Sequence, residues 1–306
     1  MIPTITVIGG LTMDLTYFVE KWPTVGKAVH AKSYKLAPGG KGLNQATALK
    51  RSGANVQFIG SVGNDDFKKE IFHEMEKDNI DTKNIIEYEV PTDLIGIIVD
   101  NLGMPGFIGI KQSTSKLSPE NIESKTNAIQ KSKSLLVNSE ISKESVLAAL
   151  KLAKANGVTT IFNPAPPELL PKEFYPLIDY LVLNSWEAKV ILGIDNLSTN
   201  QMAQELIGLG VKNVCITSGK EGCEMATSSE IIKYLAFSVK EIDETGAGDS
   251  FLGYFVNSIS TSNDINNSIR IASAAGALAC TKVGGRTSPT AIEVSKFLDE
   301  NKDIKL

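Results

Sequence analysis

Short hydrophobic runs rich in β-branched residues alternate along the chain with longer amphipathic stretches. The runs are continuously apolar rather than alternating, which is typical of strands covered on both faces. They lie at residues 5–10, 56–63, 134–140, 159–165, 180–185 and 213–219. The amphipathic stretches predict helices at residues 44–53, 65–79 and 143–157. This order predicts an α/β fold in which right-handed crossovers build a mostly parallel sheet with helices on both faces.

Two segments break this rhythm, residues 14–38 and residues 84–110. Each contains strand-like runs with no helical stretch between them, and strands that follow each other directly usually pair antiparallel. We therefore expect a small extra sheet outside the main one, where it can act as a lid. Because the chain shows no internal repeat and no long linker, residues 1–306 are expected to form one domain with this excursion.

The composition is that of an ordinary globular protein. The 306 residues are 42% hydrophobic and 22% charged, with a formal net charge of -4. This charge argues against a nucleic-acid partner held by bulk electrostatics. No apolar run approaches the ~18 residues of a membrane span, and the N-terminus lacks the pattern of a leader peptide. We therefore expect a cytoplasmic protein without a membrane partner.

The cysteines and histidines offer no structural metal site. Cys215, Cys223 and Cys280 show no CxxC spacing, and the only histidines are His30 and His73. A zinc cluster of the usual ligand pattern cannot be assembled from them. Free thiols in a reducing compartment are expected instead.

The stretch DETGAGDSF at residues 243–251 carries the strongest chemical signal. Gly246, Ala247 and Gly248 have too little side chain for a core element, and hydrophobic residues at helical spacing follow from Phe251 onward. The glycines are therefore expected at a helix N-terminus, where the first amides lack intrahelical partners and the dipole is positive. This geometry predicts an anion hole that a phosphate can approach closely.

Asp249 stands directly behind this predicted anion hole. A carboxylate there would compete with a bound phosphate unless it serves the group that attacks the phosphate. As a general base it can accept the proton of a substrate hydroxyl while the glycine amides stabilise the transferring phosphoryl group. Alternatively, Asp249 is only a first-turn acid that interacts with the helix dipole, behind a glycine turn needed for backbone geometry. This stretch alone leaves both interpretations open.

A second stretch, APGGKGLNQATALKRSG at residues 37–53, places a double glycine and Lys41 before another helix. Together, GGKGLNQA and DETGAGDSF resemble the two signature segments of the ribokinase-like (PfkB) family of sugar and nucleoside kinases. The resemblance extends over nearly the whole chain. It implies a three-layer α/β/α sandwich with a small β-sheet lid. It also implies Mg2+-dependent transfer of the γ-phosphoryl group of ATP to a primary hydroxyl of a pentose or related sugar.

The resemblance implies roles for single residues. The implied catalytic group comprises Asp249 as the base and the amides of an anion hole at Gly246, Ala247 and Gly248. The implied sugar-binding residues are Thr12, Asp14, Gly40, Lys41, Asn44 and Glu140. Carboxylates and amides suit a polyol, because each buried hydroxyl must keep its hydrogen bonds. From the residues alone, Lys41 can also be a solvated lysine at a helix start, and Asn44 a helix cap.

Three further segments resemble the nucleotide side of the family. NSWE at residues 184–187 is similar to an Asn-x-x-Glu segment that helps to organise magnesium and phosphate. TSGKEG at 217–222 resembles the loop under the nucleotide, and residues 273–288 resemble the helix and loop beside the adenine. The implied nucleotide-binding residues are Asn184, Glu187, Thr217, Ser218, Gly219, Gly222 and Ser273. Without the resemblance, Glu187 would be a helix-start acid and TSGKEG a plain hairpin turn.

The resemblance also implies a monovalent-cation loop, with potassium as an activator that stiffens the anion hole. Its ligands would be Asp243, Thr245, Cys280, Val283, Gly285 and Ser288. All-oxygen ligation suits such a hard ion. Members of the family commonly pair through their lid strands, so a homodimer is also expected.

Two departures from the family pattern lie on the substrate side. Thr12 stands where the ribose-phosphorylating members usually have Asn, and residues 109–119 lack a common Gly-Ala-Asn. A missing polar partner costs ~1–3 kcal/mol when the group it served stays buried and unsatisfied. The preferred ligand can therefore shift toward a deoxy sugar or another substrate, whereas the phosphate side is intact.

Other function classes fit the sequence less well. A P-loop kinase needs GxxxxGK[ST], but GGKGLN puts Gly42 where Ser or Thr must bind magnesium. VIGGLTMD lacks the GxGxxG of a dinucleotide-binding oxidoreductase. A nucleoside kinase on the same fold is the alternative activity. A non-catalytic sugar-sensing protein is expected to have a degraded glycine turn or no Asp249.

Overall fold

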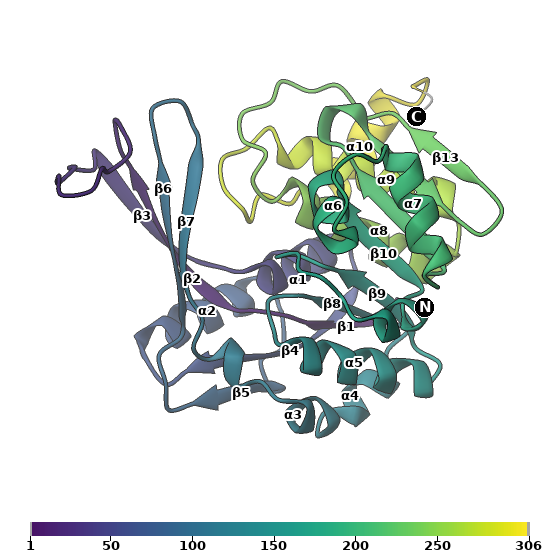
Figure 1. The fold of residues 1–306 in the computed structure, drawn as a ribbon, viewed down its shortest axis with the longest axis horizontal. Coiled ribbons are helices and arrows are strands. Elements are labelled where there is room, and N and C mark those ends of the chain that lie inside the picture. Colours follow the sequence, from purple (N-terminus) through teal and green to yellow (C-terminus); the bar gives the residue numbers. More distant parts are fainter. Residues whose placement is uncertain (1, 305–306) are drawn as a thin grey trace.

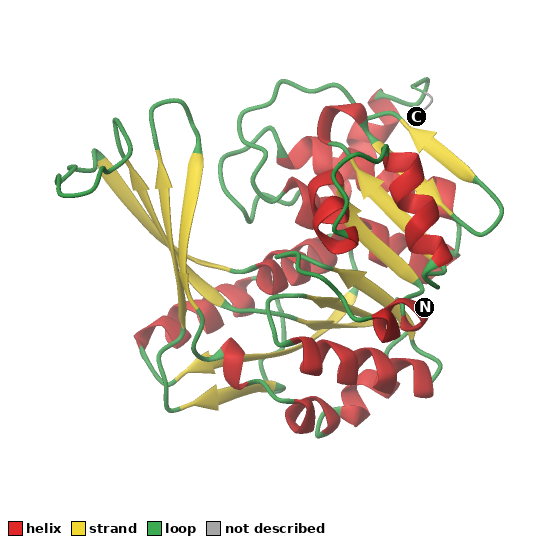
Figure 2. Cartoon of the chain, in the orientation of Figure 1, coloured by secondary structure: helices red, strands yellow, loops and turns green. Residues whose placement is uncertain are grey.

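The computed structural model describes residues 2–304 and contains two β-sheets, the larger of which is packed between helices (Figures 1 and 2). The strands of the large sheet are β1 (Thr4–Ile8), β4 (Asn55–Gly63), β5 (Ile85–Tyr88), β8 (Ser134–Asn138), β9 (Thr159–Asn163), β10 (Tyr180–Asn184), β11 (Asn213–Thr217), β12 (Cys223–Ala226) and β13 (Ile231–Tyr234). Their order is β13-β12-β11-β10-β9-β8-β1-β4-β5. Strands β5 to β11 in this order pair parallel, whereas β12 and β13 are antiparallel additions.

Helices cover both faces of the large sheet. One face packs against α1 (Lys41–Arg51), α2 (Asp66–Lys77), α8 (Ala247–Ser262), α9 (Ile265–Ala279) and α10 (Ala291–Glu300). The other packs against α3 (Pro119–Glu123), α4 (Thr126–Gln130), α5 (Lys143–Ala155), α6 (Ser185–Leu192) and α7 (Thr199–Gly208). Three short 3-10 helices complete the chain, η1 (Thr114–Lys116), η2 (Lys172–Leu177) and η3 (Gly219–Glu221).

The core lies on both sides of the large sheet. In β8, Leu136 belongs to one hydrophobic cluster, and Leu135 and Val137 belong to the other. Successive strand residues point to opposite faces, so a doubly covered strand must be apolar at every position. The predicted three-layer sandwich, its six strands and its three helices are therefore confirmed, with small shifts at their ends. Within residues 2–304, no helix is both long and apolar enough to span a bilayer.

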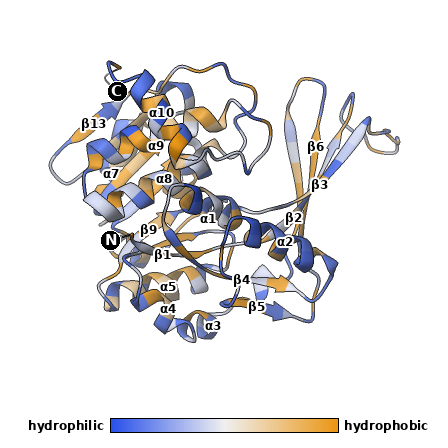
Figure 3. Cartoon of the chain, turned by 180° about the vertical axis from the view of Figure 1, so that it is seen from behind, coloured by the Kyte–Doolittle hydropathy of each residue, from blue (hydrophilic) through white to orange (hydrophobic). Residues whose placement is uncertain are grey.

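The small sheet projects from one side of the large one (Figure 1). It consists of β2 (Thr12–Phe18), β3 (Ser33–Gly39), β6 (Asp93–Val99) and β7 (Pro105–Ile110), in the order β3-β2-β6-β7. The hairpins β2–β3 and β6–β7 are antiparallel, but β2 and β6 pair parallel. Figure 3 shows that the hydrophobic colouring continues out of the core along β6.

One expectation about this excursion is wrong. Strand β5, within residues 84–110, belongs to the large sheet, where Ile85 pairs with Gly60 of β4 in a parallel ladder. It follows α2 and so completes a strand-helix-strand crossover, which requires parallel pairing. The strands of the small sheet that follow each other directly pair antiparallel as expected, and the two hairpins meet in parallel along β2 and β6.

Candidate active site

The turn before α8 has the geometry expected of an anion hole, with one change. Gly246 has a φ of 80° and is the N-cap of α8. The amide of Ser250 donates the first hydrogen bond of the helix to the carbonyl group of Gly246, at 2.9 Å. The amide of Ala247 closes the turn by donating to the carbonyl of Glu244 at 3.1 Å. Within residues 2–304, the amides of Gly246, Gly248 and Asp249 have no hydrogen-bond partner. The expected amide of Ala247 is thus occupied within the turn, and in the described chain the amide of Asp249 is free beside those of Gly246 and Gly248.

Asp249 is held against α1. The residue is 8% exposed, and its carboxylate accepts hydrogen bonds from Asn44 Nδ2 at 3.2 Å and Gln45 Nε2 at 2.9 Å. The two helices approach closely because α8 has a glycine at 253, where a Cβ would overlap the side chain of Ala48. Asn44 Oδ1 is buried and has no partner in the described part of the chain. This oxygen can therefore accept a hydrogen bond from a ligand.

Glu140 neutralises the start of α1. Its carboxylate accepts the backbone amides of Gly10, Lys41 and Gly42 at 3.0, 2.8 and 2.9 Å. The N-cap residue Gly40 has no side chain to do this, so the cap comes from the segment after β8. Burial raises the pKa of Glu140, against these donors. Much of its hydrogen-bonding capacity is thus used by the backbone.

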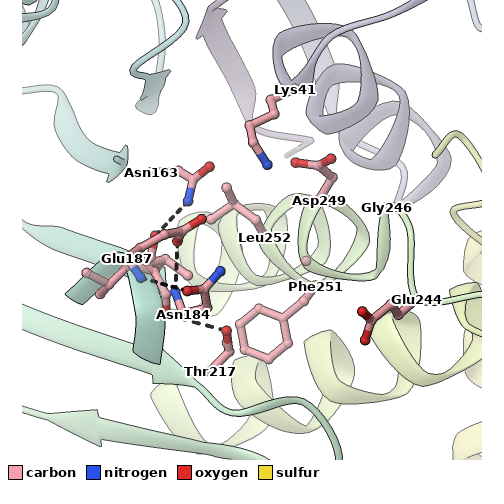
Figure 4. Close-up of a pocket in the computed structure, with 13 residues that line it drawn as sticks. Lys41, Asn163, Asn184, Glu187, Thr217, Glu244, Gly246, Asp249, Phe251 and Leu252 are labelled. Atoms are coloured by element: carbon pink, nitrogen blue, oxygen red, sulfur yellow. Dashed lines mark hydrogen bonds between the residues drawn. The ribbon is translucent and has the colours of Figure 1, made fainter. Parts of the chain in front are cut away.

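Lys41 places a positive charge beside Asp249. The pKa of Lys41 is raised, chiefly by the negative charge of Asp249 and also by those of Glu140 and Glu187. In Figure 4 the amine end of Lys41 is directed toward the Asp249 carboxylate. The negative charges of these acids keep the Lys41 amine protonated, so that it can pair with an anionic group of a ligand. Lys41 is therefore not a solvated lysine at a helix start, which was the alternative interpretation.

Asp14 approaches from the small sheet. Thr12 Oγ1 donates to Asp14 Oδ1 at 2.7 Å, and the backbone of Gly39 leaves room for the other carboxylate oxygen, which a Cβ there would overlap. Burial raises the pKa of Asp14 to about 6, and the nearby charge of Glu140 adds to this, while the bond from Thr12 opposes it. Thr12 therefore holds the acid in place.

A pocket of about 210 Å³ connects Lys41 and Asp249 to the ends of three parallel strands. The other expected sugar-binding residues lie outside its lining, namely Thr12, Asp14, Gly40, Asn44 and Glu140. Asn163, Asn184 and Thr217 are the last residues of β9, β10 and β11, and all three line it. Ligands in open α/β sheets bind at this carboxyl edge. The pocket is lined by Lys41, Asn163, Val182, Leu183, Asn184, Glu187, Thr217, Glu244, Gly246, Gly248, Asp249, Phe251 and Leu252 (Figure 4).

Asn184 and Glu187 form a capping box at the start of α6. Asn184 accepts the amide of Glu187 at 2.8 Å, and Glu187 accepts the amide of Asn184 at 2.8 Å. Burial raises the pKa of Glu187, and Lys41 opposes this. Glu187 is thus a helix-start acid, as the sequence alone suggested, and it also faces the pocket.

The loop at residues 217–222 is a tight hairpin turn between β11 and β12. The amide of Ser218 donates to the carbonyl of Gly222 at 2.8 Å, and Gly222 lies so close to the carbonyl of Tyr234 that a Cβ there would overlap it. Only Thr217 of this loop lines the pocket. Among the expected nucleotide residues, those outside the pocket lining are Ser218, Gly219, Gly222 and Ser273 of α9.

The two segments of the expected cation loop lie side by side. Asp243 accepts the amides of Thr245 at 2.9 Å and Gly284 at 2.8 Å, and the carbonyl of Cys280 accepts the amides of Ile242 and Asp243. Ser288 Oγ is buried without a partner in the described chain. Carbonyl and hydroxyl oxygens suit a monovalent cation. No group of three or more His, Cys, Asp or Glu side chains able to hold a metal occurs within residues 2–304.

The profile of the pfkB family of carbohydrate kinases matches residues 3–291. The chain belongs to this family. It is 33% identical over 304 residues to a ribokinase of Haemophilus influenzae, which covers 97% of this chain and 98% of that protein. A ribokinase of Staphylococcus aureus is 32% identical over 295 residues, 94% of this chain and 97% of that protein. The solved structure of a Thermotoga maritima ribokinase matches with a TM-score of 0.90 at 29% identity, covering 97% and 99%.

Membership of the pfkB family confirms the fold and the reaction class expected from the sequence. The protein is a kinase that transfers a phosphoryl group to an alcohol group of a carbohydrate. Of the expected signature residues, Lys41 and Asp249 line one pocket, and Asn44 donates a hydrogen bond to Asp249.

The sequence interpretation missed three buried amides in this pfkB kinase. Gln45 contacts Asp249 directly, and it also contacts Asn163 and Asn138. Asn138 and Asn163 are the last residues of β8 and β9. A polar residue ending each apolar strand was the available signal, because the carboxyl ends of parallel strands gather at one edge. Gln45 gave no signal apart from its place beside Asn44 in the motif.

Proposed function

We propose that this kinase transfers the γ-phosphoryl group of ATP to the primary hydroxyl of a pentose, with D-ribose as the first candidate. The observation that carries the proposal is the turn at Gly246, where the amides of Gly246 and Gly248 have no partner within residues 2–304 and adjoin the buried carboxylate of Asp249. A binding site for the phosphoryl group and a proton acceptor thus come from one helix terminus. Similarity to ribokinases over nearly the whole chain supports ATP and ribose as the substrates.

In this reaction the sugar hydroxyl oxygen forms a bond to the γ-phosphorus while the bond from that phosphorus to the bridging oxygen of ADP breaks. The hydroxyl proton passes to Asp249, and ADP leaves with the bonding electron pair. The amides of Gly246 and Gly248 stabilise the charge on the transferring group, and Lys41 adds a positive charge. Burial of the site strengthens each of these interactions.

Asp14 and Asn44 are the proposed direct partners of the sugar. Asn44 Oδ1 is a buried acceptor without a partner in the described chain, and Asp14 keeps free acceptor capacity beyond its bond from Thr12. We assign Glu140 and Gly40 mainly to shaping the start of α1, because the Glu140 carboxylate binds three backbone amides there.

Asn184, Glu187 and Thr217 are proposed to face the nucleotide phosphates. A carboxylate and an amide at the strand edge suit Mg2+, which is usually held by one or two carboxylates with water and substrate phosphates. When bound, the ion neutralises phosphate charge. Glu187 retains one carboxylate oxygen outside its capping box for this purpose. The proposed remainder of the nucleotide site comprises the backbone of Ser218, Gly219 and Gly222, with Ser273.

We propose potassium as an activator that would lie between the two loops beside the anion hole. The unpartnered Ser288 Oγ and the acid Asp243 support an oxygen site there. The carbonyl of Gly285 touches Gly246, so an ion held by this loop would stiffen the turn. The proposed ligand set comprises Asp243, Thr245, Cys280, Val283, Gly285 and Ser288.

The two faces of the small sheet support its proposed roles as lid and dimer contact. The strand register puts Thr12 and Asp14 on one face, toward the sugar. Leu36, Leu15, Gly96 and Ile108 align across the sheet on the opposite face. Tyr34 and Ile108 there are 70% and 68% exposed. We propose that a second copy of the chain covers this apolar face.

A substrate panel tests the proposed function. Purified protein with ATP and Mg2+ is assayed against ribose, deoxyribose, fructose, 2-keto-3-deoxygluconate and nucleosides. We expect turnover of a free pentose. Use of ATP as the phosphoryl donor would fit a cytoplasmic enzyme. Strong turnover of a nucleoside without turnover of any free pentose would contradict the proposal. Preference for deoxyribose over ribose would agree with Thr12, whose hydroxyl is already used by Asp14.

A further inference from the structure

We propose that Gln45 is a positioning residue that fixes the orientation of the Asp249 carboxylate for proton transfer. This inference rests on the proposed function, because Gln45 would act through the base of that reaction. Gln45 lies on α1, next to the expected sugar ligand Asn44, and it is 0% exposed. Its own contacts distinguish it from a substrate ligand.

Each polar atom of Gln45 is used inside the protein. Nε2 donates to Asp249 Oδ1 at 2.9 Å and to Asn163 Oδ1 at 3.0 Å. Oε1 accepts from Asn138 Nδ2 at 3.2 Å. Both donor hydrogens of Gln45 are used and its oxygen is already bonded, in contrast to the unpartnered Oδ1 of Asn44 within the described chain.

The residues around the Gln45 side chain determine which way its amide group is turned. A carboxylate can only accept, so the nitrogen of Gln45 must face Asp249. Asn163 Nδ2 donates to the carbonyl of Val182 at 2.9 Å, which turns the oxygen of Asn163 toward Gln45. The amide of Glu140 donates to Asn138 Oδ1 at 3.1 Å, which turns the nitrogen of Asn138 toward Gln45. The chain of bonds therefore has one orientation.

This arrangement fixes the carboxylate at both oxygens. Gln45 binds Oδ1 of Asp249 and Asn44 binds Oδ2, at 3.2 Å, and both donors are successive residues of one helix. Each oxygen keeps acceptor capacity for the sugar hydroxyl. A general base must lie within hydrogen-bond reach of its proton, so losing one fixed donor slows proton transfer and leaves substrate binding largely intact.

Gln45→Glu is the sharpest test, because it keeps the shape of the side chain and replaces a donor by an acid. Two carboxylates in contact share one proton, which removes the free base at neutral pH. We expect the acidic limb of the kcat profile to move to higher pH by at least about one unit. A profile that superimposes on that of the wild type after scaling would overturn the proposal.

Gln45→Met provides an independent test without a new charge. We expect kcat to fall about 10- to 100-fold, while KM for sugar and ATP changes by less than about twofold. Thr47→Val is the matched control, since Thr47 is equally buried on α1 but binds Asp78 at 3.1 Å. It should leave kcat and the pH profile unchanged. A Gln45→Met enzyme with wild-type kcat, or an equal loss in the control, would overturn the proposal. Sugar turnover by the wild type tests the reaction separately.

Discussion

Gly246 packs directly against the carbonyl group of Gly285, and a Cβ at Gly246 would overlap that oxygen. The contact joins the proposed anion hole to the loop that follows α9. With a φ of 80°, Gly246 also occupies a backbone region that other residues adopt at a cost of ~1–3 kcal/mol. This position therefore requires glycine for structure as well as for access to a phosphate.

Gly246 and Gly248 give a matched pair of alanine variants. Gly246→Ala should lower both the free energy of unfolding and kcat, because it displaces the turn. Gly248 has no atom within 4 Å of a built Cβ, so Gly248→Ala should keep or raise stability by ~0.5–1 kcal/mol. Its methyl group would nevertheless obstruct the phosphate, and we expect kcat/KM for ATP to fall at least about tenfold. Urea unfolding and steady-state kinetics measure both effects, and full activity of Gly248→Ala would contradict phosphate binding at this turn.

The buried carboxylate of Asp14, the proposed sugar ligand, should lower the free energy of unfolding near neutral pH. Its pKa is raised from 3.8 to about 6 on folding, so its contribution to the free energy of unfolding should be most favourable below pH 4 and should decrease as the pH rises from about 4 to about 6. Asp14→Asn should raise the free energy of unfolding at pH 7 by up to ~3 kcal/mol, with no gain near pH 4. It should also raise KM for the sugar, because the anionic acceptor is lost. Urea titrations at both pH values decide this, with the exposed Asp195→Asn as the control.

Glu140 should matter more for folding than the sequence suggested. Glu140→Gln replaces an acceptor of three amides with a group that can accept at only one atom. We expect a loss of ~1–3 kcal/mol in the free energy of unfolding. The exposed Glu144→Gln on α5 is the control. If Glu140→Gln unfolded like this control and changed only KM for the sugar, Glu140 would be a substrate ligand alone.

The apolar face of the small sheet should set the oligomeric state. Ile108 and Phe107 are neighbours on β7, with similar exposures of 68% and 67%, but they point to opposite faces. Ile108→Glu should convert a homodimer into monomers, because it places a charge in the proposed contact, and Phe107→Glu should not. Light scattering after size exclusion measures both masses. A wild-type monomer at micromolar concentration would contradict the proposed pairing.

The sequence predicts the sandwich because its strands are continuous apolar runs and its helices are amphipathic, which are local patterns. The strand at Ile85–Tyr88 was assigned to the wrong sheet, because the partner of a strand depends on the path of the chain and not on its own residues. Similarly, the glycines and Asp249 indicate a helix N-terminus from the local sequence alone. The orientation of the Ala247 amide toward Glu244 depends on how the turn closes.

The contacts around the base were the least predictable part of the site. Gln45, Asn138 and Asn163 come from three different elements and meet only in the folded chain. The same holds for Glu140, which lies 99 residues from the Lys41 amide it accepts. Motifs identify groups that touch a ligand, whereas groups that hold those residues are found from their hydrogen bonds.

The central claim is that Asp249 is the base of phosphoryl transfer. Its most direct test is kcat of Asp249→Asn at saturating ATP and sugar, measured with nucleotide affinity by calorimetry and with thermal unfolding. We predict a loss of at least the ~10²–10⁴-fold expected of a general base, with nucleotide affinity and folding nearly unchanged. A variant that folds, binds ATP and keeps most of its wild-type turnover would contradict the account.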